Sequence, residues 1–172
     1  GVKAISFVSD GESTCSPYLY EAVLRGKNNG LDMALGTNGF LLYDEHLKDI
    51  LSSLTYIRFN ISAADVNRYM QIHGCSSFAY LKVINTIKEC IKIKMIYNLP
   101  VTIGMQMVLL PEFRDQIIPL ARLGKHLEVD YFIIKHCSDD ELKTLDVDYS
   151  KYAGLTSTLQ EAERYSTNNY TV

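Results

Sequence analysis

Five short apolar segments recur along the chain, and a stretch whose apolar residues have helical spacing separates each from the next. We predict strands over residues 2–8, 32–35, 56–62, 101–109 and 131–135. This alternation of strand and helix predicts the α/β class, with a parallel sheet and right-handed crossovers. The repeat limits the fold more strongly than any other feature of the sequence.

The number of predicted strands limits the architecture further. A closed (β/α) barrel needs eight strands and roughly 250 residues, whereas this chain has 172 residues. We therefore predict a partial TIM-like barrel with a mainly parallel sheet of about five strands, incomplete at the N-terminal end and, as a further possibility, at the C-terminal end. We expect one domain over residues 1–172, the central part of such a barrel, in which 138–172 forms a polar connector and a last helix.

Three features between the strands, and the last residues of the chain, lead to specific expectations. The longest helix precedes Pro100, and its apolar residues keep helical spacing at Phe78, Leu81, Ile84, Ile87 and Ile91. The polar segment 63–77 is predicted to be a loop. Pro119 allows a regular helix to begin only near Gln116. The last five residues are typical of a turn that enters another strand.

The composition indicates a globular protein and argues against several partners. The net charge of −3 favours neither a nucleic acid nor an anionic membrane as a partner. No apolar run is long enough to span a bilayer. The spacing of the four cysteines fits neither a zinc motif nor a dense disulfide framework, so we expect a cytoplasmic protein.

Polar residues and glycines follow the predicted strands, and parallel strands place such residues at one end of the sheet, here called the rim. The residues of the predicted site are Asp10, Gly11, Glu12, Thr37, Asn38, Asn60, Ser62, Gln106, Lys135 and His136. Each alone also fits an ordinary turn or a buried polar group. Together they indicate a ligand site, because a carboxylate can receive an ammonium group while amides and hydroxyls can hold a ribose or a carboxylate.

Several of these segments resemble the core of the radical S-adenosylmethionine enzymes, in the branch of the molybdenum-cofactor cyclases and peptide-modifying enzymes. The resemblance lies in Ser9-Asp10-Gly11-Glu12, in Thr37-Asn38-Gly39 and in the stretch 57–63. The turn 72–74 and the stretch 108–111 also resemble the family, so that the match runs from about Ala4 to Lys135. Asp10 stands where the family usually has glycine.

The resemblance implies an enzyme that cleaves S-adenosylmethionine reductively to a 5′-deoxyadenosyl radical with a 4Fe–4S cluster. Glu12 with Gly11 would receive the methionine ammonium. Asn38, Asn60 and Ser62 would hold the ribose or carboxylate, with Thr37 in the same turn. Gln106 would face the cofactor, while Lys135 and His136 would lie near the adenine or the substrate.

The resemblance also leaves the cluster and the substrate outside the chain. The family holds its cluster with three cysteines on a loop before the region matched here, so we expect the cluster ligands upstream of Gly1. We read the chain as a fragment that is inactive alone, and we assign no catalytic residue and no metal ligand within it. The substrate, a small molecule or a peptide, cannot be identified from these residues.

Three other functions remain open from the sequence. A barrel-type lyase or isomerase would need a reactive amine at the rim, for which Lys135 is available. A non-catalytic domain would keep a pocket for S-adenosylmethionine or another nucleotide without the cluster. A purely structural role would leave the polar rim without an explanation.

Overall fold

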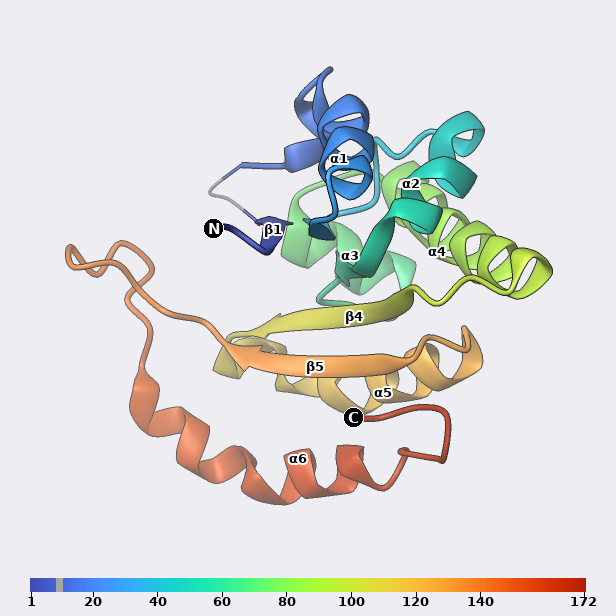
Figure 1. Ribbon diagram of the computed structural model, residues 1–172. Helices are drawn as coiled ribbons and strands as arrows, with labels where there is room; N and C mark the ends of the chain where they lie inside the picture. The colour runs from blue at the N-terminus through green and yellow to red at the C-terminus, as the bar shows by residue number, and fades with distance from the viewer. Residues whose placement is uncertain (9–10) are drawn as a thin grey trace.

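The computed structural model describes residues 1–8 and 11–172 and shows one open sheet of five strands in the order β1-β2-β3-β4-β5 (Figure 1). The strands are β1 (Ala4–Phe7), β2 (Asp32–Thr37), β3 (Leu54–Asn60), β4 (Thr102–Leu109) and β5 (Tyr131–His136). All four neighbouring pairs are parallel. The predicted α/β fold, a partial TIM-like barrel, is confirmed.

Helices connect the strands, and short 3₁₀ segments precede several of them. The α-helices are α1 (Leu19–Asn28), α2 (Leu47–Ser53), α3 (Val66–His73), α4 (Ser77–Tyr97), α5 (Ile117–His126) and α6 (Thr156–Glu163). The 3₁₀ segments are η1 (Ser13–Cys15), η2 (Asp44–His46), η3 (Pro111–Gln116) and η4 (Tyr149–Leu155). Because the strands follow one another in chain order, right-handed crossovers place the connecting helices on one face of the sheet. Figure 1 shows α5 behind β5, with α6 running below them.

Side chains alternate between the two faces of the sheet along each strand. Residues on the helix-covered face are buried, among them Met33, Leu35, Ile57, Phe59, Ile103, Met105 and Phe132. The opposite face, here called the inner face, is identified by alternation and strand register as Ala4, Ser6, Asp32, Ala34, Gly36, Tyr56, Arg58, Asn60, Thr102, Gly104, Gln106, Val108, Tyr131, Ile133 and Lys135. The hydrophobic core therefore lies between the sheet and its helices.

The segment 63–77 is not the loop that its polar composition predicts, because it contains α3. Asp65 caps this helix by accepting a hydrogen bond from the Arg68 amide at 2.9 Å. Gly74 ends the helix in the left-handed conformation, with φ of 62°. The two capping residues are the sequence signals that identify this short helix.

Arg68 ties α3 to η3. Its Nε and Nη2 donate to the two carboxylate oxygens of Asp115 at 2.9 and 2.8 Å. Gln116 accepts a hydrogen bond from the Ala64 amide at 3.0 Å and so holds the chain that leaves β3. These contacts fix the loop on the rim side of β3 against the loop that follows β4.

We expect the contribution of Asp115 to stability to depend on pH. The hydrogen bond from Arg68 lowers the pKa of this carboxyl below its usual value. A lowered folded-state pKa stabilises the protein above the unfolded-state pKa of about 3.9, and that contribution disappears as the pH falls through the folded-state value. Urea unfolding of wild type and Asp115→Asn should differ slightly at pH 7, because the Asp115 carboxylate is exposed, and the difference should disappear as the pH falls below the folded-state pKa. A difference that persists at the lowest pH would contradict this account.

The two helices for which the sequence makes specific predictions are present. The longest is α4, with 21 residues, as predicted. Its residues Phe78 and Leu81 are 64% and 53% exposed, so the apolar spacing extends beyond the buried face. Pro119 falls in the first turn of α5, where its missing N–H needs no partner, which confirms the predicted helix start.

The two outer strands have different surroundings. β1 pairs with β2, and its residues 4–6 are exposed. At the other edge, Thr171 forms a parallel bridge to Tyr131 of β5, and its carbonyl accepts a hydrogen bond from the Phe132 amide. The last residues therefore turn into an extended segment, as predicted. Within the described ranges, none of the helices combines the length and hydropathy needed to cross a bilayer.

Candidate functional site at the strand ends

The ends of β1 and β2 are joined by the carboxylate of Glu12. Its Oε1 accepts hydrogen bonds from the Thr14 amide at 3.1 Å, the Thr14 hydroxyl at 2.7 Å and the Thr37 hydroxyl at 2.6 Å. Its Oε2 accepts a hydrogen bond from the Asn38 amide at 2.7 Å. Since each carboxylate oxygen offers about two acceptor sites, Oε1 is fully used while Oε2 can accept one more donor.

The turn after β2 is organised by the side chain of Thr37. Thr37 is 1% exposed, and its hydroxyl donates to Glu12 while accepting the Gly39 amide at 3.0 Å. Asn38 accepts the Phe40 amide through its Oδ1 at 2.9 Å. Gly39 has φ of +78°, which favours glycine. Each residue of Thr37-Asn38-Gly39 therefore stabilises the turn, either through a hydrogen bond or, at Gly39, through its left-handed backbone conformation.

We expect Thr37→Val to destabilise the protein by about 2 to 3 kcal/mol, although valine has nearly the same shape. The change removes one donor to Glu12 and leaves the Gly39 amide without its acceptor. Thr37→Ser keeps the hydroxyl and should cost about 1 kcal/mol for the lost methyl group. Chemical denaturation of the two variants measures the difference, and equal stabilities would show that the hydroxyl does not hold the turn.

The ends of β3 and β4 present a second polar pair beside this turn. Gln106 donates through Nε2 to Asn60 Oδ1 at 3.1 Å, and the two residues are register partners on the inner face. Asn60 follows the Thr37–Phe59 register pair, so it lies beside the turn that begins after Thr37. The Asn60 amide group thus keeps its own N–H donors for a ligand.

Ser62 is buried, and both its hydroxyl and its backbone amide form hydrogen bonds within the protein. It is 7% exposed, its hydroxyl accepts the Val108 amide at 3.4 Å, and its own amide donates to His73 Nε2 at 3.3 Å. Burial lowers the pKa of His73, which favours the neutral imidazole that this hydrogen bond requires. Ser62 therefore connects the end of β3 to β4 and α3.

The structure separates the last two residues of the predicted site. Lys135 is exposed on the inner face, where its register partner is Val108. His136 points to the opposite face, because side chains alternate, and its ring lies edge-on to Tyr152 of η4, with centroids 6.3 Å apart. Asp10 lies outside the described residues. The structure thus brings Glu12, Thr37, Asn38, Asn60 and Gln106 together, and it places His136 elsewhere.

The sequence analysis does not identify the polar residues deeper on the inner face. Arg58 lies two residues before Asn60 on β3, beside Gly36 of β2 and Gly104 of β4. Tyr56 and Tyr131 lie on the same face of the sheet. The alternation of Tyr56, Arg58 and Asn60 along the strand is the sequence signal that identifies them.

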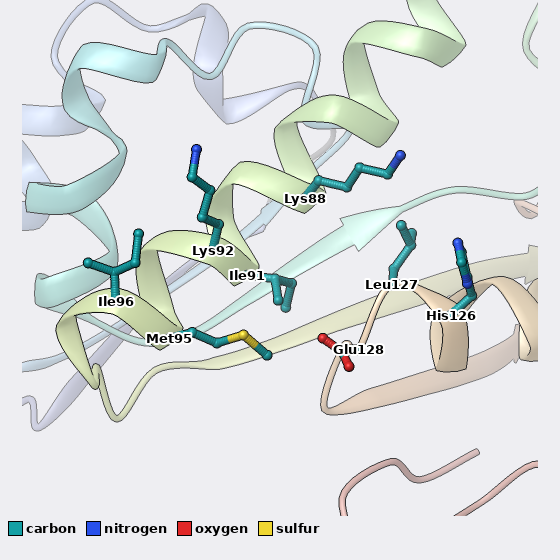
Figure 2. Close-up of a pocket in the computed structure, with 8 residues that line it drawn as sticks. All are labelled: Lys88, Ile91, Lys92, Met95, Ile96, His126, Leu127 and Glu128. Carbon is teal, nitrogen blue, oxygen red and sulfur yellow. The ribbon is translucent and has the colours of Figure 1, made fainter.

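Cavities also occur far from the rim. Figure 2 shows a cavity of about 390 Å³ between α4 and the turn after α5. Its residues are Lys88, Ile91, Lys92, Met95, Ile96, His126, Leu127 and Glu128. Because the helices run antiparallel to the strands, their C-terminal ends lie near the strand starts, at the opposite end of the sheet from the rim. This cavity and the predicted site are separate features of the molecule.

The described part of the chain contains no group of three or more His, Cys, Asp or Glu side chains arranged to hold a metal ion. All four cysteines are free thiols; Cys15 is exposed, Cys75 is partly buried, and Cys90 and Cys137 are buried. Burial raises the pKa of the Cys90 thiol to about 12, which keeps it protonated. These residues do not fit an iron–sulfur cluster.

No protein-family model and no curated protein matches the sequence, but solved structures match the fold. TYW1 with a bound lysine–pyruvate adduct matches at a TM-score of 0.67 and 21% identity, over 92% of this chain and 50% of that one. SuiB from Streptococcus suis bound to S-adenosylmethionine matches at 0.70 and 14%, over 98% of this chain and 39% of that one. The enzyme anSMEcpe with bound S-adenosylmethionine matches at 0.70 and 14%, over 95% of this chain and 46% of that one.

The matched structures are radical S-adenosylmethionine enzymes, and this chain spans half of TYW1 and less of the other two. At these identities the likeness concerns the fold. It agrees with the consecutive parallel strands, the helices on one face and the polar residues at the strand ends. The chain therefore has the partial-barrel fold of the radical S-adenosylmethionine enzymes.

Proposed function

We propose that the rim binds S-adenosylmethionine and that the chain is the cofactor-binding core of a radical S-adenosylmethionine enzyme. The proposal rests on the contacts at the strand ends. The Glu12 carboxylate accepts hydrogen bonds from the turn after β2, and the Asn60–Gln106 pair lies beside this turn. Neighbours of the same fold carry S-adenosylmethionine. The geometry supports binding because unused acceptor and donor groups lie next to one another at one end of the sheet.

Each rim residue receives a role that its contacts allow. Glu12 Oε2 and the backbone at Gly11 would accept the methionine ammonium, since Oε2 has acceptor capacity left. The donors of Asn38 and Asn60 would hold the ribose or the carboxylate. Gln106 would orient Asn60 and face the cofactor.

Four residues have supporting or more distant roles in the proposal. Thr37 would act through Glu12, because its hydroxyl is fully engaged with the carboxylate and the turn. Ser62 would contact the ligand while bonded to β4. Lys135 would lie above the adenine or the substrate from the inner face, while His136 would reach either only after a change of side-chain position.

A 4Fe–4S cluster supplies the electron for reductive cleavage in enzymes of this fold. The described residues offer no set of ligands for it, so we assign this chain the binding and orientation of S-adenosylmethionine and no electron-transfer step. The substrate, either a small molecule or a peptide such as the precursor that SuiB binds, and a cytoplasmic location are part of the proposal for the intact protein.

A second candidate, a domain that binds S-adenosylmethionine without redox chemistry, uses the same rim contacts of Glu12 and Asn60. Both candidates predict that the isolated chain binds S-adenosylmethionine. Calorimetric titration with S-adenosylmethionine, and with ATP as the control nucleotide, tests this shared requirement. We expect saturable binding of S-adenosylmethionine and at least tenfold weaker binding of ATP. Equal binding of both, or none, would contradict the proposal.

A further inference from the structure

Arg58 is a cation on the inner face, and its guanidinium group has no hydrogen bond or ion pair with any described residue. It is partly buried, and its Nε atom is buried without a hydrogen-bond partner in residues 1–8 and 11–172. An N–H group that is buried without an acceptor is costly and calls for an explanation. The position of Arg58 on the sheet supplies one.

Glycines flank Arg58 on both neighbouring strands. Gly36 of β2 and Gly104 of β4 are its register partners, so neither strand places a side chain beside the arginine. Larger residues cover these glycines instead. A Cβ atom at Gly36 would lie 3.0 Å from the Val8 side chain, and one at Gly104 would lie 2.1 Å from the Tyr131 ring. The arrangement leaves the arginine between an apolar side chain and an aromatic ring.

Hydroxyl groups accompany the arginine on the same face. Tyr56 shares a hydrogen bond with the Ser6 hydroxyl at 3.2 Å. Tyr131 is close enough for the positive charge of Arg58 to oppose the rise in its pKa that burial causes. No carboxylate of the described residues lies within ion-pair distance of Arg58, whereas Arg25 and Arg68 each have one. Among the described residues, the inner face therefore offers a guanidinium and phenol groups, and no carboxylate is paired with the guanidinium.

We propose that Arg58 binds an oxoanion, a carboxylate or a phosphate, of a second molecule on the inner face, with the Tyr131 hydroxyl as a further donor. A guanidinium binds such groups through two parallel hydrogen bonds. Arg58 lies two residues below the Asn60–Gln106 pair, roughly 6 to 7 Å deeper along the strand. S-adenosylmethionine bound at the rim would not occupy this deeper position, so the substrate can bind there. The substrate would then be an anionic molecule.

The inference rests on the proposed function only in calling this molecule the substrate, because anion binding is measured without S-adenosylmethionine. Inorganic phosphate serves as the probe for the isotope-labelled chain, and NMR follows the Arg58 Nε–H signal and the amides of Gly36 and Gly104. We expect saturable shifts in the wild type. Arg58→Gln should weaken phosphate binding at least tenfold, whereas Arg25→Gln, which removes an exposed arginine of α1, should not change it.

A titration with S-adenosylmethionine tests whether Arg58 binds an anionic group of a second molecule or the methionine carboxylate of S-adenosylmethionine itself. If Arg58 serves a second molecule, Arg58→Gln should leave the affinity for S-adenosylmethionine within about threefold of the wild type. A tenfold loss would assign Arg58 to the methionine carboxylate and overturn the proposal, as would the absence of phosphate-induced shifts at these amides. Should Arg58→Gln not fold, Arg58→Lys keeps the charge without the paired donors and should still weaken phosphate binding severalfold.

Discussion

Glu12→Ala should weaken the binding of S-adenosylmethionine at least tenfold, which corresponds to about 1.4 kcal/mol or more. The change removes the carboxylate proposed for the methionine ammonium. It should also lower the free energy of unfolding by about 2 to 3 kcal/mol, because the Thr37 hydroxyl and the Asn38 amide lose a charged acceptor. Calorimetry and chemical denaturation measure the two effects.

Two further variants separate binding from stability. Glu12→Gln keeps one carbonyl oxygen but no charge, so it should lose less stability than alanine and still lose affinity for the ammonium. Glu21→Ala removes an exposed acid of α1 whose contact is a 3.5 Å pair with Arg25, and it should change neither quantity appreciably. A folded Glu12→Gln variant with wild-type affinity would show that the charge of Glu12 takes no part in binding.

Gly39→Ala should lower the free energy of unfolding by roughly 3 kcal/mol, because it combines an unfavourable backbone conformation with a steric clash. About 1 to 2 kcal/mol comes from forcing alanine to φ of +78°. The remainder comes from the Phe59 ring, which would lie 2.8 Å from the new Cβ atom. Because Phe59 is fully buried, its ring has little room to move.

Gly30→Ala is the matched control for this prediction. Gly30 has the same φ of +78°, but a Cβ atom there would meet nothing within 4 Å. Its cost should therefore be the conformational part alone, about 1 to 2 kcal/mol. Equal losses of stability in the two variants, measured by urea unfolding, would mean that the turn after β2 is not packed against Phe59 as described.

Much of the fold follows from the periodicity of the sequence. Five apolar segments between helical stretches predict parallel strands in chain order, and the sheet has that order. The start of α5 follows from Pro119, because proline is tolerated in the first turn of a helix. The apolar periodicity does not indicate helix α3, because this helix is short and polar; its identification depends on Asp65 and Gly74 at its ends.

The site was predictable in outline, and its internal contacts were not. Turn residues after the strands identify the rim, but the bond from Thr37 to Glu12 joins residues 25 positions apart and depends on strand register. The separation of Lys135 from His136 follows from the alternation of side chains along β5 and could have been predicted. The lack of a neighbouring side chain beside Arg58 depends on glycines in two other strands. A pattern within β3 alone therefore cannot predict it.

The most direct test of the proposed function is an NMR titration of the ¹⁵N-labelled chain with S-adenosylmethionine. We predict saturable shifts at the amides of Gly11, Asn38, Asn60 and Gln106, which lie at the carboxyl ends of four adjacent strands or in the chain that follows them. The amides around the cavity in Figure 2 should not shift. Shifts confined to that cavity, or no shifts at saturating concentrations, would contradict a cofactor site at the rim.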